Sequence, residues 1–576
     1  MAVTPTPSGA GEAEAKGRRG PVGEGGWGFR RLVPWSGWGL GVGAVALVLS
    51  VPVLVVVGSV FRPAGEVWRH LAATVLPEYV ASSLLLMGGV GGGTLLLGVS
   101  TAWLATLCRF PGHRLFQWAL LLPMAMPAYI IAYTYTGLLD FSGPVQSALR
   151  GWFGWGYGDY WFPPVRSLGG AVVMLSLVLY PYVYLLSRAA FREQSVAALE
   201  ASRTLGCGPW RSFFAVALPL ARPAVAAGVS LALMEALADF GTVQYFGVNT
   251  FTTGIFRTWF GLGERVAAAQ LAALMLAFVL ALIVLERLSR RRARYHHTGQ
   301  RQQTGAGYAL EGWRAAAAFG ACALPVFFGF LLPAGQLAAW ALQTWDHAVD
   351  AAFWRLARNS LLLAAGAAAL TLALAVFLSY GRRLRPSLPV AAAVRAAGMG
   401  YAVPGLVIAV GVIIPFAWLD HTIDAWMRGA FGVSTGLLLS GTLTAVIFAY
   451  AVRFLAVSLH TVEAGLGKVR PSMDEAARSL GLRPAAVLGR VHLPLLRGSL
   501  LTALLLVFVD VLKELPATLI LRPFNFNTLA VRAFELASDE LLAESAAAAL
   551  AIVLAGLLPV ILLSRSIRRG RGPGEG

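Results

Sequence analysis

Four carboxylates lie inside two long apolar stretches of this 576-residue chain, and their spacing repeats. They are Glu235 and Asp239 and, 275 residues later, Asp510 and Glu514. Each pair is spaced i, i+4, which predicts that both carboxylates share one helix face. A carboxylate in an apolar helix is costly unless it faces a polar cavity or a partner of opposite charge. The chemistry indicated is therefore electrostatic, either attraction of a cation or bracing between helices.

Helix breakers follow both acidic pairs, Gly241 in the first stretch and Pro516 in the second. Broken helices near the middle of a membrane are where transporters often place their substrates. The alternative is structural, with Asp510 pairing with Lys513 at i+3 and the other acids bonding to neighbouring helices. The sequence leaves the pathway and bracing hypotheses open for these five residues.

No other set of residues indicates catalysis, and no stable metal site is assigned. Cys108, Cys207 and Cys322 are scattered without a CxxC spacing, and the eight histidines form no HExxH. A phosphate-binding loop requires GxxxxGK[ST], and none of the three lysines lies in that pattern. The chain is therefore expected to be no enzyme and to bind no cofactor itself.

The elements that position the acids are membrane spans. The chain is 57% hydrophobic and 13% charged, with a mean hydropathy of +0.68. Ten runs long enough to cross a bilayer contain no charge, among them Leu115–Leu139, Ala396–Leu419 and Gly429–Val452. With the two acidic stretches, this predicts an all-α polytopic membrane protein with about twelve transmembrane helices.

The net charge of +18 follows membrane topology. If both termini are cytoplasmic, 34 of the 46 lysines and arginines fall on the cytoplasmic side. That asymmetry explains the basic excess without a nucleic-acid partner. The loops 139–167, 246–264 and 522–544 are then expected outside.

The chain is also an internal duplication. The segment Glu200–Arg222 recurs as Glu475–Arg497, with 11 of 23 positions identical. Six spans per half make the two repeats parallel. The predicted organisation is a disordered cytoplasmic tail (1–37), a first half (38–286), a basic cytoplasmic linker (287–314), a second half (315–564) and a cytoplasmic tail (565–576).

Both repeated segments fall in predicted cytoplasmic loops, 188–222 and 459–497, and are expected to form helix–turn–helix units. In the second copy, Ser472 to Glu475 has the spacing of a capping box that would begin a helix. Gly481 suits the left-handed position that ends this helix. Pro484 suits the first turn of the next helix.

The pattern Glu-Ala-x-x-x-x-Gly with a later Leu-Pro resembles the EAA loop of binding-protein-dependent ABC importers, with Ser202 departing from the usual Ala. The matching residues are Glu200, Ala201, Arg203, Gly206, Leu218 and Pro219, then Glu475, Ala476, Arg478, Gly481, Leu493 and Pro494. The resemblance implies a type I importer fold, docking of both loops onto separate ATPase subunits that form a homodimer and use ATP and Mg²⁺, and a substrate-binding protein. It implies a bacterial inner-membrane location.

A narrower resemblance covers the chain after its N-terminal tail. Met234–Thr242, Phe508–Thr518 and Leu521–Val531 are similar to fused ferric iron permeases. This implies uptake of Fe(III) delivered by a periplasmic or lipoprotein binding protein; thiamine, a polyamine, sulfate or another small solute is the alternative. Tyrosines of the third and fourth spans could supply phenolate ligands to iron, but the preferred interpretation is that they are packing and interface aromatics. They are Tyr129, Tyr133, Tyr135, Tyr180, Tyr182 and Tyr184.

The competing class is a secondary transporter with six plus six helices. That class would be expected to carry a charged signature between the second and third spans. The chain has only Arg109 to Arg114 there, and secondary transporters lack EAA loops.

Overall fold

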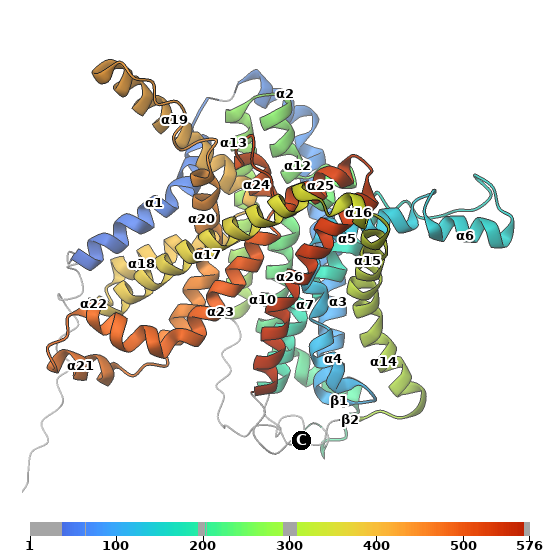
Figure 1. Ribbon diagram of the computed structural model, residues 1–576. Coiled ribbons are helices and arrows are strands. Elements are labelled where there is room, and N and C mark those ends of the chain that lie inside the picture. Colours follow the sequence, from blue (N-terminus) through green and yellow to red (C-terminus); the bar gives the residue numbers. More distant parts are fainter. Residues whose placement is uncertain (1–36, 64, 194–201, 203, 292–307, 570–576) are drawn as a thin grey trace, which may run out of the picture.

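The computed structural model describes residues 37–63, 65–193, 202, 204–291 and 308–569, and it is a bundle of long helices (Figure 1). Eleven helices are long and apolar enough to cross a membrane, and one bent helix pair brings the number to twelve. The predicted all-α polytopic fold is confirmed. The first 36 residues of the predicted disordered tail lie outside the described residues.

The first half contains α1 (Gly37–Ser59), α2 (Glu66–Thr74), α3 (Leu76–Leu107), β1 (Cys108–Arg109), α4 (His113–Ala119), η1 (Leu122–Ala125), α5 (Ala128–Leu139), α6 (Pro144–Phe153), α7 (Leu168–Glu193), α9 (Pro209–Ser212), η2 (Phe213–Ala217), α10 (Leu218–Ala238), α11 (Gly241–Tyr245), α12 (Phe251–Phe256), η3 (Arg257–Gly261) and α13 (Arg265–Arg291).

The second half contains β2 (Tyr308–Ala309), α14 (Gly312–Val326), η4 (Phe327–Leu331), α15 (Leu332–Gln343), α16 (Trp345–Ala348), α17 (Ala351–Leu384), α18 (Leu388–Ala397), η5 (Gly398–Ala402), α19 (Gly405–Phe431), α20 (Leu443–Leu466), α21 (Pro471–Ser479), α22 (Pro484–Val487), η6 (Leu488–His492), α23 (Leu493–Leu512), α24 (Pro516–Leu521), α25 (Leu529–Ser538) and α26 (Leu542–Arg569).

Figure 1 shows α21 and the β1–β2 pair at one end of the bundle, and α2, α12 and α25 at the other. These are called the α21 end and the α2 end below. The two strands pair in parallel over two residues, Cys108 with Tyr308 and Arg109 with Ala309. They fasten the last part of the predicted linker to the end of α3. Burial raises the pKa of the Cys108 thiol to about 11, so this thiol is a poor nucleophile at neutral pH.

The two halves exchange helices. One hydrophobic core joins α3, α5, α7 and α10 of the first half to α14, α15 and α26 of the second. The other core joins α17, α19, α20 and α23 of the second half to α1 and α13 of the first. The first and last spans of each half therefore pack against the opposite half, and neither half can bury its apolar surface alone.

Prolines break the third span of each half. Pro127 separates η1 from α5, where the helical pair bends by 89°, and Pro404 separates η5 from α19. A proline lacks the N–H needed to continue a helix and pushes the preceding residue into an extended conformation. Met126 and Val403 have that conformation, with ψ of 115° and 125°.

These breaks correct three predicted spans. The run Leu115–Leu139 is not one straight helix but the bent pair. Its counterpart Ala396–Leu419 is replaced by α19, which begins after Pro404, and Gly429–Val452 by α20, which begins at Leu443. The charge-free runs mark the apolar segments correctly, but charged residues at the ends of α19 and within α20 continue the helices beyond them.

Candidate functional site

The spans that carry the acids break where Gly241 and Pro516 predict. In the first half α10 ends at Ala238, and Asp239 adopts an extended conformation. Asp239 Oδ1 accepts from the N–H groups of Thr242 (3.1 Å) and Val243 (3.2 Å), and Oδ2 accepts from Thr242 Oγ1 (3.0 Å). The carboxylate therefore satisfies N–H groups that the short helix α11 would otherwise leave without an acceptor.

Glu514 has the same position in the second half. Its Oε1 accepts from the N–H of Ala517 (3.1 Å) in the first turn of α24, and lies 3.1 Å from Arg453 Nη1. The other acid of this pair, Asp510, forms an ion pair with Lys513 (2.8 Å), as the sequence predicts. The two equivalent acids, Asp239 and Glu514, therefore stabilise equivalent helix breaks.

This geometry corrects the shared-face prediction. Glu235 and Asp510 lie within α10 and α23, whereas Asp239 and Glu514 lie beyond the helical ends at Ala238 and Leu512. The i, i+4 spacing places two side chains on one face only while the helix continues, and here it ends between them.

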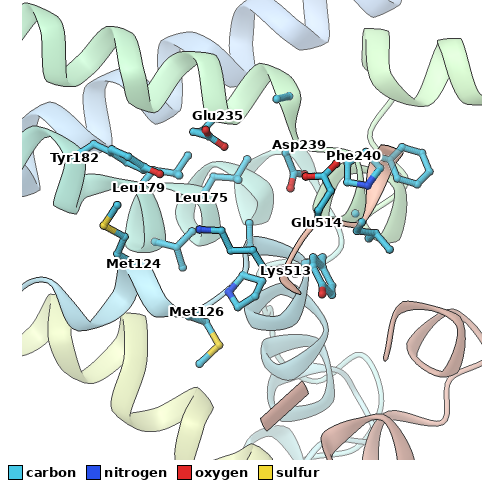
Figure 2. A pocket seen from close by; sticks show the side chains of 18 of the residues that line it. Met124, Met126, Leu175, Leu179, Tyr182, Glu235, Asp239, Phe240, Lys513 and Glu514 are labelled. Carbon is cyan, nitrogen blue, oxygen red and sulfur yellow. The ribbon is translucent and has the colours of Figure 1, made fainter. Parts of the chain in front are cut away.

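The predicted acids meet at a cavity of about 130 Å³ between the two halves (Figure 2). The first half contributes Glu235 and Asp239 to its wall, and the second contributes Glu514, Lys513 and Arg453. Apolar side chains complete the wall, among them Met124, Met126, Leu175, Leu179 and Phe240. Of the five predicted pathway residues only Asp510 does not line this cavity, and it contacts Lys513, which does.

Glu235 differs from the other three acids in its contacts. Within the described part of the chain, its side chain makes no hydrogen bond or ion pair, although Arg453 and Lys513 line the same cavity. Asp239 caps a helix, Asp510 pairs with Lys513, and Glu514 pairs with Arg453. Glu235 is therefore the acid with a charge available to a solute.

Arg453 directly follows the charge-free run Gly429–Val452, so the sequence predicts that it lies in the cytoplasmic loop after that span, and this prediction is wrong. It lies ten residues into α20 beside Glu514, and its side chain is 11% exposed. A β-carbon on Gly405 would lie 2.1 Å from Arg453 Nη1 and 2.6 Å from Glu514 Oε1, so this ion pair needs a glycine at the start of α19. The sequence feature that could have indicated a longer span is the apolar segment Phe454–Leu459, which directly follows Arg453. This segment is too short to predict a span by itself.

Two of the six tyrosines interpreted as packing residues also line the cavity. They are Tyr129 and Tyr182, on α5 and α7. The others lie in the hydrophobic core or bond elsewhere; Tyr135 donates to the carbonyl of Phe328 (2.7 Å) and Tyr184 to that of Gln117 (3.0 Å). Within the described ranges, no three His, Cys, Asp or Glu side chains are grouped to hold a metal ion.

The second EAA segment forms two helices, α21 and α22, at the α21 end. The predicted capping box is wrong, because α21 begins at Pro471 with Arg470 as its N-cap and no side-chain cap. Pro471 occupies the first helical position, so the helix begins there and not after a capping Ser472. The other predictions are confirmed: Gly481 has φ +78°, and Pro484 lies in the first turn of α22.

Gly481 completes a two-bond C-terminal cap. Its N–H donates to the carbonyl of Arg478 (2.9 Å), and the N–H of Leu482 donates to that of Ala477 (3.1 Å). No atom lies within 4 Å of a β-carbon built on Gly481. Glycine is therefore needed here for its backbone conformation and not because space is limited.

Residues from another span anchor α21. Arg383, near the end of α17, donates to Asp474 Oδ2 (2.8 Å) and to the carbonyls of Leu466 (2.7 Å) and Val469 (2.9 Å). The buried His492 Nε2 lies 2.6 Å from Asp474 Oδ1. These anchors were not predicted: Arg383 counted only toward the positive-inside asymmetry, and Asp474 only as part of the capping box.

The opposite face of α21 has no cover within the described chain. Glu475, Ala476 and Arg478 are exposed, and the apolar Leu480 is 81% exposed. Leu493 and Pro494 follow in the continuous helix Pro484–Leu512, immediately after the wide turn η6. An exposed leucine beside a small residue is a surface that another protein can approach closely.

Part of the first EAA segment lies outside the described residues, namely Glu200, Ala201 and Arg203. Gly206 has φ +77°, and the N–H of Cys207 donates to the carbonyl of Ser202 (2.9 Å), as in the second copy. Leu218 and Pro219 begin α10 after the wide turn η2. The two segments therefore share their C-terminal cap and their return into a span.

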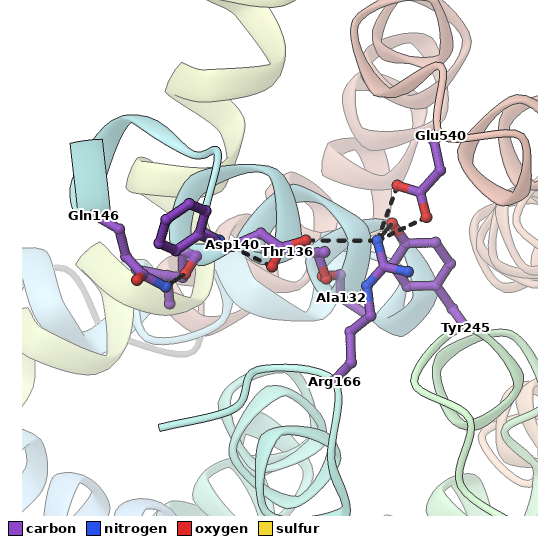
Figure 3. Close-up of polar contacts among 9 residues, drawn as sticks. Ala132, Thr136, Asp140, Gln146, Arg166, Tyr245 and Glu540 are labelled. Atoms are coloured by element: carbon purple, nitrogen blue, oxygen red, sulfur yellow. Dashed lines mark hydrogen bonds and ion pairs between the residues drawn. The ribbon is translucent and has the colours of Figure 1, made fainter. Parts of the chain in front are cut away.

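At the α2 end, a cluster around Arg166 joins the two halves (Figure 3). Arg166 Nη2 lies 2.8 Å and 2.9 Å from the two carboxylate oxygens of Glu540, and 3.8 Å from Asp140. Its guanidinium carbon lies 5.0 Å from the ring centre of Tyr245, at the end of α11. Glu540 has φ +62°, the one positive φ of a non-glycine residue in the described chain, and the ion pair holds a carboxylate where glycine is usual.

The fold and the site define a membrane-spanning permease built from two homologous halves. The chain belongs to the family of binding-protein-dependent transport system inner membrane components, which matches residues 94–295 and again residues 372–571. The two matches confirm the predicted duplication.

Three relatives show the range of the family. The chain is 26% identical to the Fe(3+)-transport system permease protein FbpB 2 of Haemophilus influenzae, over 85% of this chain and 90% of the relative. It is 30% identical to the molybdenum transport system permease protein ModB of Escherichia coli, over 35% of this chain and 89% of the relative. It is 27% identical to the sulfate transport system permease protein CysT of Escherichia coli, over 38% and 78%.

Proposed function

We propose that this permease imports ferric iron across a bacterial inner membrane. One observation carries the choice of solute: the likeness to a relative named for Fe(3+) transport extends over 85% of this chain, through both halves. The relatives named for molybdenum and sulfate transport are shorter proteins that match over 89% and 78% of their own lengths, and they are similar to 35% and 38% of this chain. Thiamine and polyamines remain alternative solutes of the same importer class.

The charges at the cavity support a cationic solute. Arg453 and Lys513 each form an ion pair with a carboxylate of their own half. Among the described residues, this leaves Glu235 as the carboxylate that lines the cavity without a hydrogen bond or ion pair. Ferric iron is a hard cation and prefers oxygen ligands. An oxyanion such as sulfate would meet an excess of negative charge.

Energy enters through separate subunits in this proposal. The chain lacks a phosphate-binding loop, so ATP and Mg²⁺ are used by a homodimer of ATPase subunits that dock on the two EAA segments. The exposed face of α21, with Glu475, Ala476 and Leu480, is the docking surface in the second half. The α21 end is then cytoplasmic, the proposal places both termini on that same side of the membrane, and the α2 end faces the substrate-binding protein.

The test is transport by the complete complex. The permease is reconstituted with its ATPase and binding protein, and uptake of radioactive Fe(III) is measured in vesicles with and without ATP on the side of the ATPase. We expect ATP-dependent iron uptake, with ATPase activity stimulated by the iron-loaded binding protein. Stimulation by sulfate, molybdate, thiamine or a polyamine in place of iron would contradict the choice of solute while leaving the importer class intact.

The Arg166 cluster gives a second expected result. Because it joins α11 and the loop before α7 to the α25–α26 turn, movement of that turn away from α7 and α11 must break it. Arg166→Ala should therefore raise ATPase activity without the binding protein several-fold. An exposed ion pair is worth at most about 1 kcal/mol, so thermal stability should change little.

Glu540→Gly provides the matched control for this prediction. It removes the same ion pair but relieves the positive φ, so it should raise basal ATPase activity without any loss of stability. Basal activity that stays at the parent level in both variants would contradict a closing role for the cluster.

A further inference from the structure

A second cavity, of about 690 Å³, lies at the α2 end and is separate from the acidic cavity. Its walls come from the ends of α1 and α13 in the first half, and from α19 and the loop after it in the second half. These three helices contact one another pairwise, so the cavity lies within a packed contact between the halves.

The polarity of the cavity wall changes with depth. Arg62 follows the last turn of α1, and Arg265 is the first residue of α13, so both guanidinium groups lie at helix ends. Val55 lies about one turn before the end of α1, and Ala269 lies about one turn after the start of α13. Both line the cavity, and Ile414 lines it from α19. A molecule that fits this wall has a charged end and an apolar tail.

The charged end of the cavity is held in place and is not neutralised. Buried Gln270 donates through Nε2 to the carbonyls of Ser59 (3.4 Å) and Arg62 (3.2 Å), which ties the end of α1 to α13 beside Arg265. Within the described ranges, neither the Arg62 nor the Arg265 side chain makes a hydrogen bond or ion pair. No acidic side chain is among the residues that line this cavity.

Two tryptophans place the charged end at the level of lipid head groups. Trp259 and Trp418 both line the cavity, and Trp418 is 65% exposed. Tryptophan is enriched where the hydrocarbon of a membrane meets its polar surface, because the indole has an apolar body and one N–H donor. At that depth the molecules with a negative charge and an apolar tail are anionic phospholipids.

We propose that this cavity binds one anionic glycerophospholipid. Its phosphate lies between Arg62 and Arg265, where both guanidinium groups can donate hydrogen bonds to it. One acyl chain runs inward along Val55, Ala269 and Ile414. The lipid bridges the halves, because α1 and α13 belong to the first half and α19 to the second.

The experiment is native mass spectrometry of the full-length permease in its complex, released from nanodiscs that contain phosphatidylglycerol and phosphatidylcholine in equal amounts. We expect the parent protein to retain one phosphatidylglycerol. Arg62→Gln combined with Arg265→Gln should reduce the retained phosphatidylglycerol about tenfold. Arg69→Gln, an exposed arginine at the same end, is the matched control and should retain it.

A second variant tests the apolar part without altering charge. Ala417→Phe places a ring in the cavity and should lower retention of phosphatidylglycerol, while a melting curve reports whether the helices still pack. Equal retention in the parent and the double arginine variant would overturn the proposal. Equal retention of phosphatidylcholine and phosphatidylglycerol by the parent protein would also overturn the proposal. The site would then bind the acyl chain without recognising the charge of the head group.

Discussion

Replacing Gly481 with valine should leave a folded permease that no longer couples to its ATPase. Gly481 has φ +78°, and a β-branched residue held in that left-handed region costs about 1–3 kcal/mol. The cap that ends α21 relaxes, and the exposed face with Glu475 and Leu480 turns away from its partner. Stimulation of ATPase activity by the loaded binding protein should fall at least about tenfold, since about 1.4 kcal/mol is a factor of ten.

The controls separate backbone strain from bulk. A β-carbon at Gly481 meets no atom within 4 Å, so a side chain as such is tolerated there. Asparagine adopts the left-handed conformation more readily than other residues, and Gly481→Asn should retain most of the coupling. Gly489→Val adds the same bulk at a helical glycine with equally open surroundings and should couple normally. Equal coupling in Gly481→Val and Gly489→Val would contradict the role given to α21.

The sequence predicts the membrane fold well because its signal is local. A span needs about 20 apolar residues wherever it packs, so hydropathy finds the helices without knowledge of their neighbours. The caps at Gly206 and Gly481 and the helix breaks near Gly241 and Pro516 were predictable for the same reason. Each depends on the conformational preference of one residue.

What the sequence could not predict depends on distant contacts. Arg453 ends an apolar run, and only its pairing with Glu514, 61 residues away, allows it to lie inside a span. The exchange of α1 and α13 with α14 and α26 between the halves cannot be recognised in the sequence. An apolar helix face has the same composition whether its own half or the opposite half packs against it. Arg383 and Asp474 meet in the same way, 91 residues apart.

The structure also divides the four acids, which sequence spacing alone treats as equivalent. Asp239 and Glu514 accept hydrogen bonds from the first turns of α11 and α24, so they brace the helix breaks. Glu235 faces the cavity and has no hydrogen-bond or ion-pair partner in the described chain. We therefore expect the bracing hypothesis to hold for the first two residues and the pathway hypothesis for Glu235.

Glu235→Gln should lower iron uptake by about tenfold or more and preserve the complex. Attraction between two unit charges at 4 Å is worth about 1–4 kcal/mol, depending on how much water surrounds them. Loss of that attraction should lower uptake by about tenfold or more, while thermal stability and ATPase stimulation by the binding protein stay near parent values. Glu235→Asp restores the charge and should recover part of the uptake. Glu264→Gln, which neutralises an exposed acid before α13, should transport normally.

The bracing acids should give the opposite pattern in the same assays. Glu514→Gln leaves the buried Arg453 without its charged partner, and breaking a buried pair costs about 3–5 kcal/mol. Its yield, melting temperature, ATPase stimulation and uptake should therefore fall together. Asp239→Asn keeps an oxygen for the N–H groups of α11 and should lose less. Normal iron uptake by a stable Glu235→Gln complex would remove Glu235 from the pathway, while the importer assignment, which rests on the family and the EAA segments, would stand.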